Sequence, residues 1–184
     1  AMDTMLRRCK RDPDNSDWQR ELSVSHNCVG DILQAQGNLD EALREYQAYM
    51  SFMRRLCERD PDNSYWQREL SVSHNCVGDI LQAQGNLAEA LREHQAAMDI
   101  MRHLCERDPD NSDWQGDLSL SHHSLAKILE AHDHLTEALI HREADLAITE
   151  RLTQLDVTNA QRQMDLQDSH QALDVLKQRI EKTK

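Results

Sequence analysis

The sequence predicts an all-α protein built as a solenoid of stacked antiparallel helical hairpins. Its 184 residues include only 5 glycines and 3 prolines, too few for the many turns of an all-β sandwich or barrel. A unit of 48 residues recurs along the chain, and residues 13–60 differ from residues 61–108 at only seven aligned positions. Periods of about 20 to 50 residues are typical of arrays in which each unit buries its apolar face against its neighbours.

Each unit is predicted to hold two helices. In the first unit, apolar residues fall three or four positions apart across residues 18–33 and again across residues 39–56. Only the dipeptide Gly37-Asn38 interrupts the two stripes, which indicates a short turn with left-handed backbone. Two helices of about 20 residues, each about 30 Å long, then fill the period.

The ends of the predicted helices carry local signals. Ser16 with Gln19 three residues later predicts a capping box at the start of the first helix, and the same pair recurs in the next two units. The dipeptide Asp12-Pro13 ends the preceding helix, because the residue before proline is driven away from α geometry. The expected divisions are a partial second helix in 1–12, repeats in 13–60, 61–108 and 109–156, and a C-terminal capping helix in 157–184, helical from about Asn159 to Glu181.

The repeated residues resemble the tetratricopeptide repeat, and the resemblance covers nearly the whole chain. It implies a right-handed superhelix with a non-catalytic role. The usual period is about 34 residues, so the longer units look like the long-repeat arrays of many bacterial proteins. The third unit departs from the pattern and should be packed differently, or cross more widely, at Ala126, Asp133 and Arg142. The matching residues are a small residue at the helix crossing (Gly30, Gly78), a turn glycine (Gly37, Gly85), a buried alanine (Ala42, Ala90, Ala138) and an aromatic ring (Tyr46).

The same resemblance implies that the first helices line a concave groove where partners bind. Asp31 and Asp79 occupy a slot that holds Asn in relatives that clamp the C-terminal carboxylate of chaperones, so that ligand is disfavoured. The acidic bias instead favours a neutral to basic peptide or protein. The expected lining residues are Arg20, Asn27, Asp31, Gln34, Arg68, Asn75, Asp79, Gln82, His123, Lys127 and Glu130.

Charge and hydropathy exclude two classes of partner. The formal net charge is −12, whereas a grip on nucleic-acid phosphates or on an anionic bilayer needs clustered Lys and Arg. No stretch approaches about eighteen consecutive apolar residues, the length that predicts a membrane span. The expectation is a cytoplasmic protein with no nucleic-acid or membrane partner.

Histidines and cysteines also follow the period. His26, His74, His122 and His170 are expected to pack between helices, because equivalent imidazoles about 10 Å apart cannot share one metal ion. The cysteines are expected to be small, buried thiols in a reducing compartment. The tripeptide 132–134, His-Asp-His, leaves a metal-binding sensor open as an alternative.

These observations predict a non-catalytic interaction scaffold, a segment of a larger multidomain protein, with no cofactor. No Gly-rich phosphate loop and no arrangement of Ser, His and acid stands out, so an enzyme is not expected. A self-assembling structural module is a second reading, since residues 2–10 supply only half a hairpin and leave an apolar end open for self-association.

Overall fold

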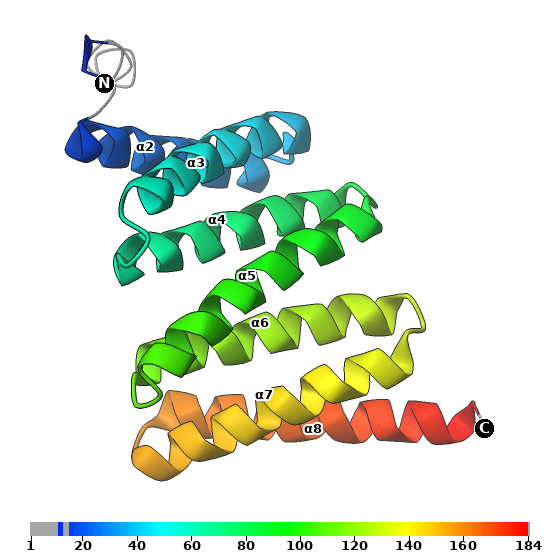
Figure 1. Ribbon diagram of the computed structural model, residues 1–184. Helices are drawn as coiled ribbons and strands as arrows, with labels where there is room; N and C mark the ends of the chain where they lie inside the picture. Colours follow the sequence, from blue (N-terminus) through cyan, green and yellow to red (C-terminus); the bar gives the residue numbers. More distant parts are fainter. Residues whose placement is uncertain (1–10, 13–14, 184) are drawn as a thin grey trace. The chain divides into compact units, whose positions relative to one another are not determined.

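The computed structural model describes residues 11–12 and 15–183, so the expected partial helix in 1–12 lies almost entirely outside the described residues. The described part of the chain contains helices, turns and no strand, which confirms the all-α prediction. Its seven helices are α2 (Ser16–Ala35), α3 (Leu39–Arg59), α4 (Ser64–Ala83), α5 (Leu87–Arg107), α6 (Ser112–Ala131), α7 (Leu135–Leu155) and α8 (Ala160–Lys182) (Figure 1).

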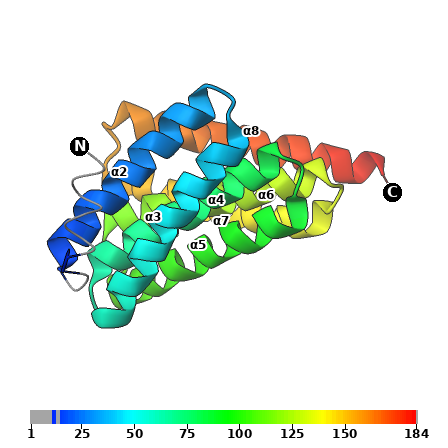
Figure 2. The same cartoon turned by 90° about the horizontal axis from the view of Figure 1, so that it is seen from above.

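The helices form two compact units, which meet within α5. Unit 1 ends at Ile100 and unit 2 begins at Met101. In unit 1, α2 packs on α3 and α3 packs on α4, while in unit 2, α6 packs on α7 and α7 packs on α8. Figures 1 and 2 both show α2 beside α3 and α7 beside α8. The predicted helical hairpins are therefore confirmed in each unit.

The helix starts are capped one residue earlier than the sequence predicts. The N-cap of α2 is Asn15, and its side-chain oxygen accepts a hydrogen bond from the backbone N–H of Trp18 at 3.1 Å. The capping box assigned to Ser16 and Gln19 is wrong, because Ser16 is already the first helical residue. Equivalent asparagine caps begin the later helices at Asn63, Asn111 and Asn159.

The turns within the hairpins require left-handed backbone. Gly37 and Gly85 have φ angles of 77° and 81°, and a left-handed residue costs glycine little because it has no Cβ. In the third hairpin Asp133 takes the same role at φ 61°. Aspartate tolerates this region better than most residues, so the turn survives the loss of glycine.

The helix crossings of unit 1 depend on two glycines. A Cβ on Gly30 would lie 2.6 Å from Cε1 of Tyr46, and a Cβ on Gly78 would lie 2.7 Å from Nε2 of His94. The rings therefore pack directly on the backbone of the facing helix. In unit 2 the corresponding pair is Ala126 and Arg142, so a buried arginine side chain replaces the ring. The third hairpin is therefore packed differently at this crossing, as predicted.

A second part of the unit 1 core lies where α3 meets α4. Tyr49, Met53 and Leu56 are each at most 2% exposed and form one apolar cluster. The Tyr49 hydroxyl donates to Oε2 of Glu69 at 2.7 Å, so the ring is buried while its polar end is satisfied. Burial and the neighbouring Glu69 raise the pKa of Tyr49, which keeps the phenol a donor.

Candidate functional site

The predicted groove residues lie on three helices that each open a hairpin. Every one of them is exposed or half-buried. The set therefore lies on the protein surface, as a partner-binding face requires. Four of the residues are on α2 (Arg20, Asn27, Asp31, Gln34), four are on α4 (Arg68, Asn75, Asp79, Gln82), and three are on α6 (His123, Lys127, Glu130).

A buried tyrosine fixes the carboxylate of Asp31. The Tyr46 ring is 1% exposed, and its hydroxyl lies 2.8 Å from Oδ1 of Asp31 and 2.8 Å from Oε1 of Gln34. The hydroxyl has one proton, so it donates to one of these oxygens at a time. Burial and the Asp31 carboxylate raise the pKa of Tyr46, and the phenol therefore remains protonated. Asp31 is exposed but held in one orientation.

A histidine occupies the tyrosine slot in the next hairpin. His94 is 1% exposed, and its Nδ1 donates to Oδ1 of Asn75 at 3.0 Å. Its Nε2 lies 3.6 Å from Oδ1 of Asp79, which is too long for a hydrogen bond. Burial lowers the pKa of His94 despite the nearby Asp79 carboxylate, so the ring is neutral at pH 7. The Asp79 carboxylate itself is exposed.

The α2 and α4 residues meet around one thiol. Cys76 Sγ lies 3.9 Å from Oδ1 of Asn27, which brings the two helices together at this point. Burial, and then the carboxylates of Asp79 and Asp31, raise the pKa of Cys76 to about 12. Both carboxylates thus act on the same small region. We call Asn27, Asp31, Asn75 and Asp79 the acidic face of unit 1.

The other end of the same helices carries positive charge. The guanidinium of Arg20 lies over the Tyr65 ring, with its central carbon 5.4 Å from the ring centroid. Tyr65 is the second residue of α4, so this contact is also made between α2 and α4. At about 1.5 Å per residue, Arg20 lies about 17 Å along α2 from Asp31. The predicted groove in unit 1 therefore has an acidic end and a basic end.

The predicted groove residues of unit 2 surround an arginine. Arg142 is 5% exposed, and its Nε donates to Oε1 of Glu130 at 2.7 Å. Its Nη1 lies 3.0 Å from Nδ1 of His123, and because arginine can only donate, this imidazole nitrogen accepts. Two of the three predicted residues on α6 are thus joined through one side chain from α7. This part of unit 2 is closer to charge balance than the acidic face.

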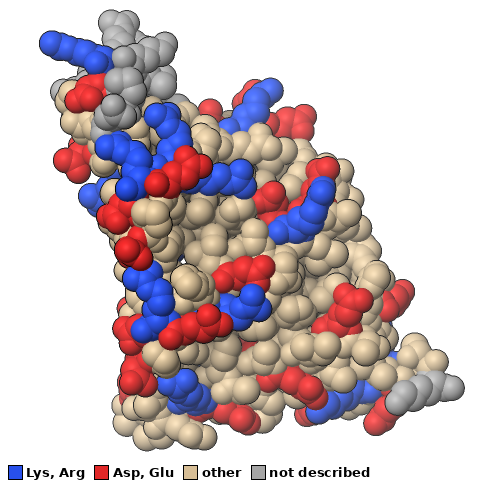
Figure 3. All heavy atoms as spheres, in the orientation of Figure 1, with Lys and Arg blue, Asp and Glu red and all other residues tan. Residues whose placement is uncertain are grey.

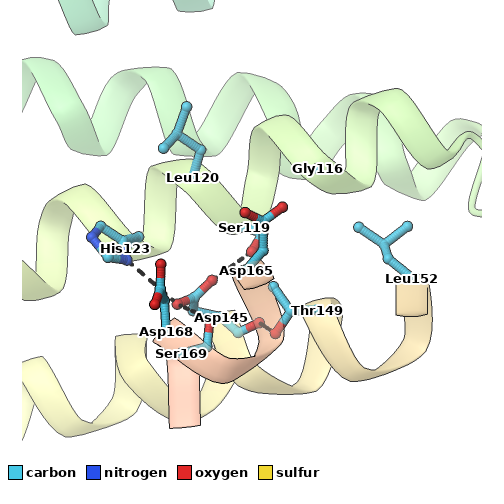
Figure 4. Close-up of a pocket in the computed structure, with 10 residues that line it drawn as sticks. All are labelled: Gly116, Ser119, Leu120, His123, Asp145, Thr149, Leu152, Asp165, Asp168 and Ser169. Carbon is cyan, nitrogen blue, oxygen red and sulfur yellow. Dashed lines mark hydrogen bonds and ion pairs between the residues drawn. The ribbon is translucent and has the colours of Figure 1, made fainter. Parts of the chain in front are cut away.

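A buried carboxylate at the centre of unit 2 was not predicted from the sequence. Asp145 of α7 is 2% exposed and accepts hydrogen bonds from Ser119 Oγ of α6 at 2.5 Å and from Ser169 Oγ of α8 at 3.0 Å (Figure 4). His123 Nδ1 lies 3.7 Å from the same carboxylate. Burial by itself would raise the pKa of Asp145, but the hydrogen bonds from Ser119 and Ser169 outweigh it and lower the pKa. The carboxylate is therefore ionised.

Serine, histidine and aspartate meet here without the connectivity of a catalytic triad. In a triad the serine donates to the histidine, which removes its proton during attack. Here the Ser119 hydroxyl donates to Asp145, and His123 Nδ1 accepts from Arg142. His123 is therefore not placed to accept the proton of Ser119.

Three of the recurring histidines pair with the second helix of their own hairpin, whereas the prediction that His170 packs between helices is wrong, because His170 is exposed on α8. Nδ1 of His26 and of His74 each lie 2.6 Å from a glutamate oxygen, on Glu45 and Glu93 respectively. In unit 2 the glutamate is replaced, and Nδ1 of His122 lies 2.9 Å from Nδ1 of His141. Burial and then His141 lower the pKa of His122 to about 4, and burial also lowers the pKa of His141. Two neutral imidazoles, tilted by 43° with their ring centroids 5.2 Å apart, thus replace an acid–histidine pair.

Metal and thiol chemistry find little support in the described residues. Within 11–12 and 15–183, no three His, Cys, Asp or Glu side chains are grouped so that they could hold a metal ion. The described cysteines are free thiols, and Cys105 is buried as predicted. The prediction of burial is wrong for Cys28, which is exposed, whereas the equivalent Cys76 is covered from α2.

Residues 68–144 match the family model described as tetratricopeptide repeat. The matched segment includes the acidic residues of α4, the buried His94 and the Arg142 cluster. This segment of the chain is therefore similar to tetratricopeptide repeats. Such repeats generally mediate protein–protein interaction or scaffolding, and the helical fold is generally non-enzymatic. No curated protein matches the sequence.

One solved structure agrees with the helical-repeat fold. The chain is similar to BtubC (BKLC) from P. vanneervenii, with 14% sequence identity and a TM-score of 0.58 over 89% of this chain. It spans 64% of the length of that protein. A de novo designed helical repeat protein matches with 10% identity and a TM-score of 0.43, over 98% of this chain and 92% of the design.

The surface of the protein is not uniformly acidic. On the face drawn in Figure 3, Lys and Arg side chains are interspersed with Asp and Glu, so no large patch of one sign forms there. No helix among the described residues is long and apolar enough to cross a bilayer.

The sequence contained a signal for the residues that were missed. Gly116 of α6, Asp145 of α7 and Thr149 of α7 break the repeat at positions where the first unit has Arg20, Tyr49 and Met53. These breaks fall on two helices, α6 and α7, whose facing positions the sequence does not reveal.

Proposed function

We propose that this tetratricopeptide-type chain is a non-catalytic scaffold whose acidic face binds a peptide or protein segment of neutral to basic character. One observation carries the proposal: two exposed carboxylates, Asp31 and Asp79, lie near one thiol on neighbouring helices, and buried side chains adjoin them from behind. The similarity to tetratricopeptide repeats supports a general role in binding proteins, and the two exposed carboxylates support a partner of neutral to basic character.

Preorganisation favours binding at this face. The hydrogen bond from the buried Tyr46 restricts the rotamers of Asp31, so less side-chain entropy is lost when a partner arrives. Amide groups at Asn27 and Asn75 lie beside the carboxylates and can pair with a partner backbone. A Lys or Arg of the partner would contact the carboxylates, and its acidic or polar residues would lie toward Arg20.

The predicted groove residues of unit 2 are of mixed charge. Lys127 is exposed, while His123 and Glu130 are half-buried and joined to Arg142. This part of α6 is therefore less negative than the acidic face. The free thiols at Cys28, Cys57, Cys76 and Cys105 support a reducing, cytoplasmic setting for this interaction.

The experiment that tests the proposal compares capped peptides of one length that differ only in being basic, neutral or acidic. Fluorescence anisotropy at low and at high salt would report their affinities. We expect the basic peptide to bind most tightly and to weaken as salt rises. The double variant Asp31→Asn, Asp79→Asn keeps side chains of nearly the same size and removes both negative charges. It should weaken binding of the basic peptide about tenfold.

A matched control removes the same charge from second helices. The double variant Glu58→Gln, Glu89→Gln changes two exposed glutamates on α3 and α5 and should leave the affinity within about twofold of the parent. If both double variants weaken the peptide equally, net charge rather than the acidic face determines binding. If neither does so, the acidic face is not the binding surface.

A further inference from the structure

Unit 2 contains a pocket that shares only His123 with the predicted groove residues. Its volume is about 340 Å³, and residues from three helices line it. Figure 4 shows side chains of α6, α7 and α8 converging on Asp145. The lining residues are Gly116, Ser119, Leu120 and His123 of α6, Asp145, Thr149 and Leu152 of α7, and Asp165, Asp168 and Ser169 of α8.

The same location is filled in unit 1. Tyr49 and Met53 occupy the positions that Asp145 and Thr149 hold in unit 2, and both are at most 2% exposed. A phenol ring and a thioether are thus exchanged for two short polar side chains. Such a reduction in side-chain volume leaves space unless the helices close over it, and here a pocket remains.

A third substitution removes a side chain from the mouth. Gly116 stands where α2 and α4 have Arg20 and Arg68. A Cβ built on Gly116 would meet no atom within 4 Å, so the backbone does not need glycine for close packing. Glycine in a helix interior costs about 1 kcal/mol relative to alanine. Gly116 therefore lowers the stability of α6 slightly and leaves open space beside the pocket that it lines.

The pocket is suited to a cation. Asp145 is an ionised carboxylate at its base, and Asp165 and Asp168 are exposed acidic residues on α8. The lining residues include no Lys or Arg, so an anion would meet only carboxylates, hydroxyls and one imidazole. Leu152 and Leu120 offer apolar contact for the methylene groups that carry a charged head.

In unit 1 an arginine and an aromatic ring of the chain itself are in contact at the start of the first helices. Arg20 there lies over Tyr65 in a corner that Ser16, Asp17 and Trp66 also line. The chain thus supplies its own guanidinium between consecutive first helices. In unit 2 the two partners of that contact are replaced by Gly116 and Gln161, so the corresponding corner holds neither an arginine nor an aromatic ring.

We propose that the unit 2 pocket receives the guanidinium of an arginine side chain from a binding partner, between Asp145, Asp165 and Asp168. A planar guanidinium with five donors can pair with several carboxylate oxygens at once, while its methylene stem packs on the leucines. The pocket lies in α6 to α8, apart from the acidic face on α2 and α4, and does not depend on that face.

The test uses N-acetyl-arginine amide as the probe and the whole chain as the target. Amide chemical shifts would be followed by NMR during titration. We expect saturable binding, of about millimolar affinity for so small a ligand, with the largest shifts at Gly116, Ser119, Ser169 and their neighbours. N-acetyl-citrulline amide has nearly the same shape without charge, and it should give no saturable shift.

Two variants complete the test. Gly116→Arg restores the arginine of the other first helices, which would compete within the chain, and it should weaken the probe at least about tenfold. Asp174→Asn, an exposed α8 residue outside the lining, is the matched control and should bind like the parent. Circular dichroism would show that both variants keep their helices.

Three results would overturn the proposal. They are equal binding of the citrulline compound, unchanged binding to Gly116→Arg, and shifts that lie away from α6 to α8. Because the probe reports on α6 to α8 and the peptide test uses substitutions on α2 and α4, either result can fail while the other holds.

Discussion

The same corner of the hairpin is closed in unit 1 and hollow in unit 2. In unit 1 the ring of Tyr49 fills it and donates outward to Glu69, so the interior is apolar and the polar atom is satisfied at its edge. In unit 2 Asp145 places a charge inside and needs Ser119 and Ser169 to satisfy it. A repeat can therefore keep its helices while exchanging an apolar core for a polar pocket.

The histidine slots differ in the same direction. His26 pairs with Glu45 in unit 1, whereas His122 faces His141 in unit 2. The pattern of helices tolerates either pair because both span the same distance between the helices of a hairpin. The lowered pKa values of His122 and His141 make the stability of unit 2 sensitive to acid.

The largest expected effect comes from emptying the closed corner. Tyr49→Ala should lower the free energy of unfolding by about 3–5 kcal/mol, because a buried ring is lost and a cavity remains. Urea denaturation followed by circular dichroism would measure it. Tyr49→Phe, which removes only the hydroxyl, should cost about 1 kcal/mol. Equal losses in the two variants would show that the ring does not fill the corner.

Removing the buried charge should have the next largest effect. Asp145→Ala leaves the hydroxyls of Ser119 and Ser169 without their acceptor, and we expect a loss of about 2–3 kcal/mol in the same denaturation experiment. Asp174→Ala on the exposed surface of α8 should change the stability by less than about 0.5 kcal/mol. An Asp145→Ala protein as stable as the parent would mean that the network does not hold unit 2 together.

Acid should weaken unit 2 through its histidine pair. The pKa of His122 is lowered to about 4, while an unfolded histidine titrates near about 6.5, so the unfolded chain binds protons first as the pH falls. Stability attributable to the neutral pair is present above about pH 6.5 and is lost progressively toward about pH 4, by about 1–2 kcal/mol after allowance for partial exposure.

The variant His141→Glu recreates the pairing of the other hairpins and should reduce this acid-dependent loss. Urea denaturation near neutral pH and at about pH 4.5 would compare it with the parent. His103→Glu changes an exposed histidine of α5 and serves as the control. A loss that is the same in the parent and in His141→Glu would place the acid sensitivity elsewhere.

The smallest expected effect is a gain. Gly116→Ala should stabilise the protein by up to about 1 kcal/mol, because alanine is a better helix former and a Cβ meets no atom within 4 Å. The melting temperature would report it. A destabilised Gly116→Ala protein would show that the glycine is needed for packing.

Much of the fold could be predicted because the same pattern of apolar and turn residues recurs in each 48-residue repeat. Apolar spacing located the hairpins, and Gly37 located a turn by the left-handed backbone that it allows. The cap was displaced by one residue, because a serine beside an asparagine offers two similar acceptors and only the geometry selects Asn15. The resemblance located the first-helix surface, but nothing in it indicated that Tyr46 adjoins Asp31.

The pocket could not be predicted for a different reason. Its ten lining residues come from three helices, and each substitution is unremarkable alone. The loss of Tyr49 and Met53 opens space only because both positions face the same corner. A comparison of the third 48-residue repeat with the first shows that Gly116, Asp145 and Thr149 are each smaller than the residue at the equivalent position.

The most direct test of the account is to map a basic peptide onto the labelled chain by NMR. We predict that the shifted amides lie on α2 and α4 around Asn27, Asp31, Cys76 and Asp79, with a second cluster around Ser119 and Ser169 when the peptide contains arginine. Shifts confined to α3 and the exposed side of α5, or no saturable shift at all, would contradict the assignment of binding to the acidic face.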